Sequence, residues 1–99
     1  MEFGEYIRSL REKRNMLLRE MAANLNMDVA YLSKIERGNR MARREQVEDL
    51  AKVLNKNKDE LLNLWMADKI VNMIKDESNI TEILKITEEK INKLTNKKQ

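Results

Sequence analysis

The chain has 99 residues, enough for one hydrophobic core, and its content of 41% hydrophobic and 37% charged residues is typical of a folded domain rather than of a disordered segment. With no proline and only two glycines it has few of the turn residues that a sheet needs, so we predict an all-α fold. Cysteine and histidine are both missing, which removes disulfides, thiolate nucleophiles, imidazole bases and the usual zinc ligands. We therefore expect neither an enzyme nor a metal ion or other cofactor.

Apolar residues at helical spacing predict three helices in the first part of the chain, over residues 2–15, 18–25 and 28–37. Asn26 stands between the second and the third, where a residue that tolerates a left-handed backbone is needed. Asp28 is a good N-cap for the third helix, and Gly38 follows that helix as a stop signal. Two short helices joined by a tight turn predict a helix-turn-helix.

Three further helices are predicted after a basic stretch. The fourth covers residues 45–54, and a capping-box pattern at Asn57-Lys58-Asp59-Glu60 opens a long fifth helix. A similar start at Asn79 opens the sixth helix, whose apolar residues fall on one stripe.

The positive charge is concentrated in one part of the chain. Residues 8–44 carry ten basic and four acidic side chains, and every arginine of the protein lies among them. Arginine matches phosphates and base edges better than lysine does, so this bias indicates a nucleic acid as the partner.

Residues 10–61 carry a more specific resemblance. Leu10-Arg11-Glu12-Lys13-Arg14, Met21-Ala22, Leu32-Ser33-Lys34-Ile35-Glu36-Arg37-Gly38 and Leu50-Ala51-Lys52-Val53-Leu54 resemble the Cro and phage-repressor family, also called the xenobiotic-response-element family. The resemblance implies a five-helix, repressor-like DNA-binding domain over residues 1–64, followed by a C-terminal helical extension over residues 65–99.

The resemblance also implies a sequence-specific regulator of transcription whose helix at about residues 28–37 reads the major groove. Val29 and Ala30 have no side-chain hydrogen-bonding group, so they could read only thymine methyls or DNA shape, whereas Lys34 could read guanine. Arg11 and Glu36 match a structural ion pair of the family. The expected DNA-binding residues are Arg19, Asp28, Val29, Ala30, Tyr31, Ser33, Lys34, Arg37, Asn39, Arg40, Arg43 and Arg44.

Two positions depart from the family pattern. The second helix usually begins with a Ser or Thr cap followed by a phosphate-binding Gln, but here these positions are Leu17 and Leu18. The lost cap costs about 1 kcal/mol, and Arg19 could replace the missing phosphate contact.

The C-terminal extension is too apolar to be left in water. We expect it to form a homodimer, because readers of this type bind two half-sites about 34 Å apart on a (pseudo)palindromic operator in double-stranded DNA. The expected interface residues are Trp65, Ile70, Val71, Ile74, Ile80, Leu84 and Ile91.

Several alternatives remain open from the sequence. The chain could be a repressor or autoregulator, a restriction–modification controller or an antitoxin, and neighbouring genes would separate these. A protein-interaction module that no longer reads DNA is the alternative of another class, supported by apolar residues at normally polar DNA-facing positions. The acidic start does not resemble a secretory signal and no apolar run approaches the ~20 residues of a membrane span. We therefore expect a cytoplasmic protein without a membrane partner, and no segment indicates a small-molecule ligand.

Overall fold

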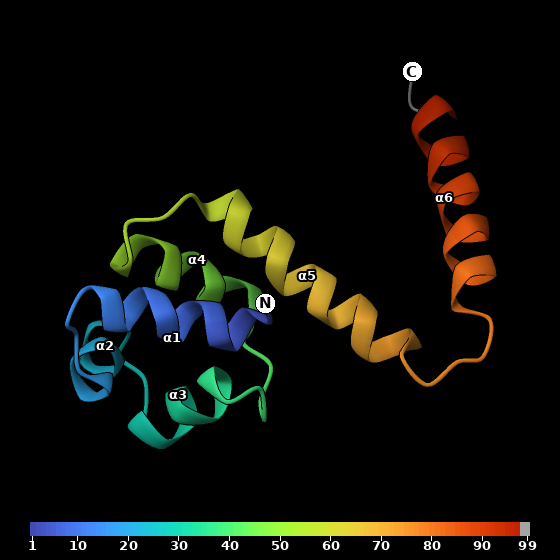
Figure 1. Ribbon diagram of the computed structural model, residues 1–99. Coiled ribbons are helices and arrows are strands. Elements are labelled where there is room, and N and C mark those ends of the chain that lie inside the picture. The colour runs from blue at the N-terminus through green and yellow to red at the C-terminus, as the bar shows by residue number, and fades with distance from the viewer. Residues whose placement is uncertain (98–99) are drawn as a thin grey trace. The chain divides into compact units, whose positions relative to one another are not determined.

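The computed structural model describes residues 1–97, which form six helices and no strand, so the predicted all-α class is confirmed (Figure 1). By its internal contacts the chain divides into two compact units, one covering Met1–Lys69 and the other beginning at Ile70. The helices are α1 (Phe3–Lys13), α2 (Leu18–Asn24), α3 (Val29–Glu36), α4 (Arg44–Val53), α5 (Lys58–Ile74) and α6 (Ile80–Lys97).

Local side-chain chemistry explains several of the helix starts. Asp28 accepts hydrogen bonds from the backbone N–H groups of Ala30 and Tyr31 at 2.8 and 3.3 Å, and so caps α3 as predicted. The side chain of Asn57 caps α5 in the same way, through the N–H of Glu60 at 3.0 Å. At the start of α2, the N–H of Leu17 donates to Glu20 Oε1 at 2.8 Å, so one part of a capping box survives without a capping Ser or Thr.

A residue with a left-handed backbone conformation follows four of the helices. Asn15, Asn26 and Asn55 have φ of 54°, 52° and 52° after α1, α2 and α4, and Gly38 has φ of 78° after α3. Asparagine is one of the few non-glycine types that enters this region readily, so the chain reverses direction three times without glycine or proline.

The N-terminal unit packs around one core. In Figure 1, α1 lies in the middle of this unit, with α4 above it and α3 below it. The apolar faces of these helices, of α2 and of the first part of α5 meet inside. Its largest fully buried side chains are Ile7, Met21, Leu32, Ile35, Leu50, Leu61 and Val47.

A very close approach fixes α1 against α3. A Cβ atom at Gly4 would lie 2.3 Å from the carbonyl oxygen of Ile35 and 2.7 Å from that of Glu36, so only glycine fits there. The start of α1 is also tied to α5, because the N–H of Phe3 donates to Asp68 Oδ2 at 2.8 Å.

These contacts correct one prediction. Trp65, which we expected at a dimer interface, is only 4% exposed and belongs to the core of the N-terminal unit. The N-terminal compact unit extends to Lys69, because Trp65 and Asp68 continue the helical face of α5 that packs on this core.

The second unit contains the end of α5 and α6. It exposes several large apolar side chains, among them Ile70 (46%), Val71 (55%), Leu84 (46%) and Ile91 (54%). Nothing among the described residues combines the helix length and the apolar character that crossing a membrane would require.

Candidate nucleic-acid interface

The segment from α2 to α3 has the geometry of a helix-turn-helix. α2 ends at Asn24, Asn26 makes the left-handed turn, and Asp28 caps α3 two residues later. The turn is closed by the N–H of Met27, which donates to the carbonyl oxygen of Ala22 at 2.9 Å. α3 is therefore held in a fixed relation to α2, and its first turn projects from the unit (Figure 1).

α3 has one buried face and one exposed face. Leu32, Ile35 and Glu36 are buried, as expected for a helix that packs on α1 and α2. On the opposite face Ala30, Lys34 and Arg37 are exposed, and Val29 keeps 44% of its surface accessible. The residues expected to read bases thus lie together on the side of α3 that faces away from the core.

An ion pair anchors the inner face of α3 to α1. Arg11 Nε donates to Glu36 Oε2 at 2.8 Å and Arg11 Nη2 donates to Glu36 Oε1 at 3.0 Å, with the two side chains 12% and 4% exposed. Arg11 Nη1 also donates to the carbonyl oxygen of Met16 at 2.9 Å. The hydrogen bonds to Glu36, helped by its charge, raise the pKa of Arg11 although burial opposes them. These two residues hold α3 against α1 and lie on its inner face.

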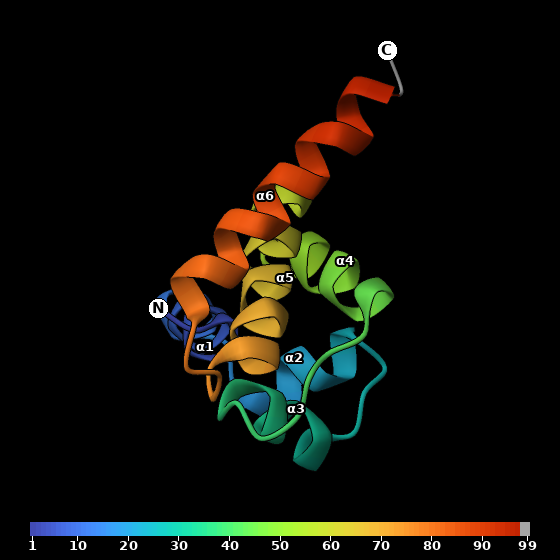
Figure 2. The same ribbon diagram turned by 90° about the vertical axis from the view of Figure 1, so that its right-hand side faces the viewer.

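Basic residues continue along the loop after α3. Gly38 ends the helix, because its N–H donates to the carbonyl oxygen of Ile35 and that of Asn39 donates to the carbonyl oxygen of Lys34. Asn39 and Arg40 are exposed in this loop, which Figure 2 shows running from α3 to the start of α4.

A small polar network joins α3 to the start of α4. Tyr31 Oη donates to Gln46 Oε1 at 3.2 Å, and the same oxygen accepts the N–H of Arg43, the N-cap of α4, at 2.8 Å. The guanidinium of Arg40 lies 5.1 Å from the centre of the Tyr31 ring. Tyr31 is half-buried, so it positions this corner as well as lining the expected DNA-facing surface.

Most of the cations on this surface have no acidic partner. Among residues 1–97, ion pairs within 4.0 Å involve none of the following side chains: Arg19, Lys34, Arg37, Arg40 and Arg44. Arg43 has one, with Glu45 at 3.2 Å, but both side chains are 68% exposed and such a pair is weak. The surface therefore keeps its positive charge available for an anionic partner.

Two residues matter here that sequence reasoning missed, Gln46 and Asp68, and a third, Trp65, was expected at a dimer interface instead. Gln46 stands three residues after the N-cap of α4, a capping-box position that could have been recognised. Trp65 and Asp68 follow Leu61 at helical spacing, which indicates one continuous buried face of α5. Of the predicted residues, Asp28 serves as the cap of α3, and Ser33 is half-buried.

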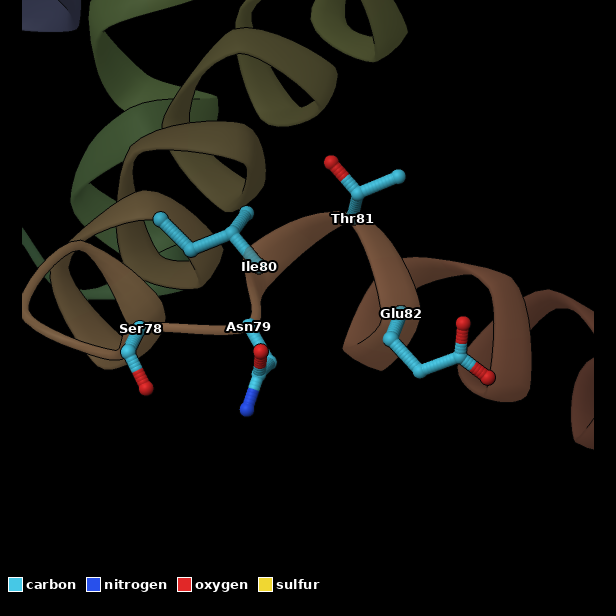
Figure 3. Close-up of a pocket in the computed structure, with 5 residues that line it drawn as sticks. All are labelled: Ser78, Asn79, Ile80, Thr81 and Glu82. Carbon is cyan, nitrogen blue, oxygen red and sulfur yellow. The ribbon is translucent and has the colours of Figure 1, made fainter.

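The described residues offer little for a metal or a small ligand. Within residues 1–97 no three acidic side chains come close enough together to hold a metal ion. One recess, at the turn before α6, is lined by consecutive residues only, from Ser78 to Glu82. In Figure 3 the side chains of Ser78 and Thr81 point in opposite directions, so they do not converge on a common ligand.

These features together define a class: a DNA-binding protein with a helix-turn-helix whose second helix presents its side chains outward. The family model of a helix-turn-helix domain matches residues 2–64, and the chain belongs to this family. The membership expected from the sequence is thus confirmed, and with it the binding of DNA in transcription regulation as the class of function.

Two solved structures share the fold. The clp gene regulator ClgR from Corynebacterium glutamicum is 21% identical, with a TM-score of 0.58 over 86% of this chain and 88% of that chain. A structure of the SinR protein/SinI protein complex gives 23% identity and a TM-score of 0.56 over 92% of this chain and 97% of that chain. A search of curated proteins finds no significant match.

Proposed function

We propose that this chain is a cytoplasmic repressor or autoregulator that binds a (pseudo)palindromic operator in double-stranded DNA as a homodimer, with α3 in the major groove of each half-site. It acts by binding alone, without catalysis, metal or small-molecule ligand. The observation that carries the proposal is the set of exposed cations without acidic partners on α3 and around it. Arg11, by contrast, is paired with Glu36 on the inner face of α3.

The residues divide into base readers and phosphate binders. Lys34 is exposed in the last turn of α3 and can donate to guanine O6 or N7, while Val29 and Ala30 can contact only thymine methyls. Arg40, Arg43 and Arg44 follow on the loop and at the start of α4, where they can neutralise phosphates and fix the register. Other expected contacts come from Arg19, Tyr31, Ser33, Arg37 and Asn39.

The second unit supplies the surface for the second copy. Ile80, Leu84, Thr87, Ile91 and Leu94 follow a spacing of three and four residues along α6 and so share one face of it. The hydroxyl of Thr87 donates to the carbonyl oxygen of Ile83 at 2.7 Å, so it adds no unsatisfied polar group to this stripe. A stripe of this kind is complementary to itself, which favours a twofold partner. With Ile70, Val71 and Ile74 it forms our proposed dimer interface.

DNA binding is tested by titrating the protein onto a labelled duplex from its own upstream region and onto a scrambled duplex, at two salt concentrations. We expect an affinity of ~10⁻⁸–10⁻¹¹ M for the upstream duplex and a preference of ~10³-fold or more. Lys34→Ala should weaken specific binding by roughly 10- to 100-fold and reduce the preference. Lys56→Ala, an exposed lysine just beyond the opposite end of α4, should change little. Binding to neither duplex at low salt would refute DNA reading and favour the protein-interaction module.

Dimerisation is tested by light scattering after gel filtration at micromolar concentration. The wild-type chain should elute at twice its mass of 11.8 kDa. Ile91→Glu should give a monomer, whereas Lys93→Glu, two residues further on, should leave the dimer intact. A wild-type monomer would exclude the twofold model.

A further inference from the structure

Trp65 connects α5 to the loop before α4 through a buried hydrogen bond. Its indole N–H donates to the carbonyl oxygen of Ala42 at 2.8 Å, and the two residues are 4% and 3% exposed. Ala42 immediately precedes Arg43, the N-cap of α4. The bond therefore fixes the backbone at the point where the basic loop enters α4 (Figure 2).

Two cationic side chains lie over the same indole ring. The guanidinium of Arg44 lies 5.5 Å from the ring centre and the ammonium of Lys69 lies 4.4 Å from it. Tryptophan attracts cations more strongly than the other aromatic residues do. Arg44 is the first residue of α4, it has no ion-pair partner among residues 1–97, and its exposed guanidinium contacts the ring.

We propose that Trp65 is a positioning residue for DNA binding. It holds the Ala42 carbonyl in the interior and the Arg44 guanidinium on the surface, so that the Arg44 side chain is already ordered before it contacts a phosphate. A flexible arginine loses side-chain entropy when it binds, whereas an arginine restrained beforehand loses less, so that without the indole ring Arg44 no longer keeps its phosphate contact. This role rests on the proposed function, because it needs a duplex on the surface formed by α3 and the start of α4.

Packing alone does not explain the arrangement. A buried indole N–H needs an acceptor, which the Ala42 carbonyl supplies. Core packing does not require an exposed arginine over the ring, yet Arg44 lies there. Through its contacts with Ala42 and Arg44, the Trp65 side chain therefore connects the core to Arg44 on the proposed DNA-facing surface.

The test compares Trp65→Leu, Arg44→Ala and the double variant in DNA titrations over a salt series. Each phosphate contact contributes about 0.9 to the slope of log K against log [salt], so Trp65→Leu should lower the slope by about that amount. When salt rises from 50 to 200 mM, the factor by which DNA affinity falls should then be about threefold smaller for Trp65→Leu than for the wild type. Adding Arg44→Ala to Trp65→Leu should have little further effect.

Two other variants separate positioning from stability. Trp65→Phe keeps a buried ring without the N–H and should lie between the wild type and Trp65→Leu, so it carries the test if Trp65→Leu fails to fold. Leu64→Ala, the half-buried neighbour on α5, should lower stability and leave the slope unchanged. The positioning role would be overturned if all Trp65 variants had the same salt slope as the wild type and their losses of DNA affinity added to the loss caused by Arg44→Ala.

The emission of Trp65, the single tryptophan, gives an independent readout. Adding the upstream duplex should change the emission of the wild-type protein, and Arg44→Ala should abolish the change without abolishing binding. The same emission change in both proteins would overturn the positioning role alone. A wild-type protein that binds neither duplex would overturn the proposed function and this role with it.

Discussion

Replacing Glu36 by Gln should strongly destabilise the N-terminal unit, because it removes the anion from a buried ion pair. The Glu36 side chain is 4% exposed and receives two hydrogen bonds from Arg11, itself 12% exposed. Removing one partner of such a pair costs about 3–5 kcal/mol, since the remaining charge stays buried. Gln keeps one acceptor oxygen and the Met16 carbonyl still binds Arg11, so we expect a value near the lower end, about 3 kcal/mol.

The measurement is urea unfolding followed by the emission of Trp65, which lies in the core of the same unit. For a unit of this size each kcal/mol moves the Tm by about 4–8 °C, so a thermal scan should show a fall of about 12–24 °C. The control is Glu12→Gln in the Arg8–Glu12 pair of α1, whose side chains are 60% and 55% exposed. Exposed pairs on one helix contribute about 0.3–0.5 kcal/mol, so this variant should change stability little.

A double substitution tests the reason for the loss. Arg11→Met with Glu36→Leu removes both charges and should recover most of the stability lost in Glu36→Gln. If Glu36→Gln costs no more than Glu12→Gln, or if the double variant is less stable than Glu36→Gln, the cost does not come from an unpaired buried charge.

Three further substitutions probe contacts to backbone groups of α1 and α3. Gly4→Ala puts a Cβ against the carbonyl oxygen of Ile35 and should cost roughly 3 kcal/mol or more in urea unfolding. Gly38→Ala should cost less, about 1–2 kcal/mol, because its Cβ meets only a flexible side chain at 3.4 Å and the cost comes from its φ of 78°. The reverse order would contradict the close approach of α1 and α3. Asp28→Ala should cost about 1 kcal/mol through the lost cap of α3 and Asp28→Ser should restore it, whereas equal losses in both variants would exclude capping as the cause. Asp68→Ala should lower the Tm by several degrees through the lost hydrogen bond to α1, and hydrogen exchange at the start of α1 should rise; unchanged exchange there would contradict this link.

The helices and their ends were predictable because their signals are local. Asp28, Asn57 and Asn26 act within one turn of where they stand, so the residue types alone indicate caps and a reversal. The exposed face of α3 follows from the 3.6-residue period, which puts Lys34 on the opposite side of the helix from the buried Leu32.

Contacts between distant segments were harder to predict. The helical spacing shows that Trp65 is on an apolar face, but it does not show whether that face packs on its own domain or on a second copy. The Ala42 carbonyl that receives its N–H is 23 residues away, and a backbone oxygen leaves no mark in the sequence. Asp68 is similar, since an acidic residue in a helix is normally solvated and only the tertiary fold brings it to the start of α1.

The asparagines that end α1, α2 and α4 also affect the unfolded chain. Asn15, Asn26 and Asn55 occupy positions that glycine could fill, yet their side chains restrict the backbone of the denatured ensemble, which glycine would leave free. Replacing a glycine by a residue that tolerates the same conformation typically gains about 0.4–1 kcal/mol in this way. Each of these asparagines thus reduces the number of conformations that the unfolded chain loses on folding. This raises the free energy of unfolding without any contact in the folded state.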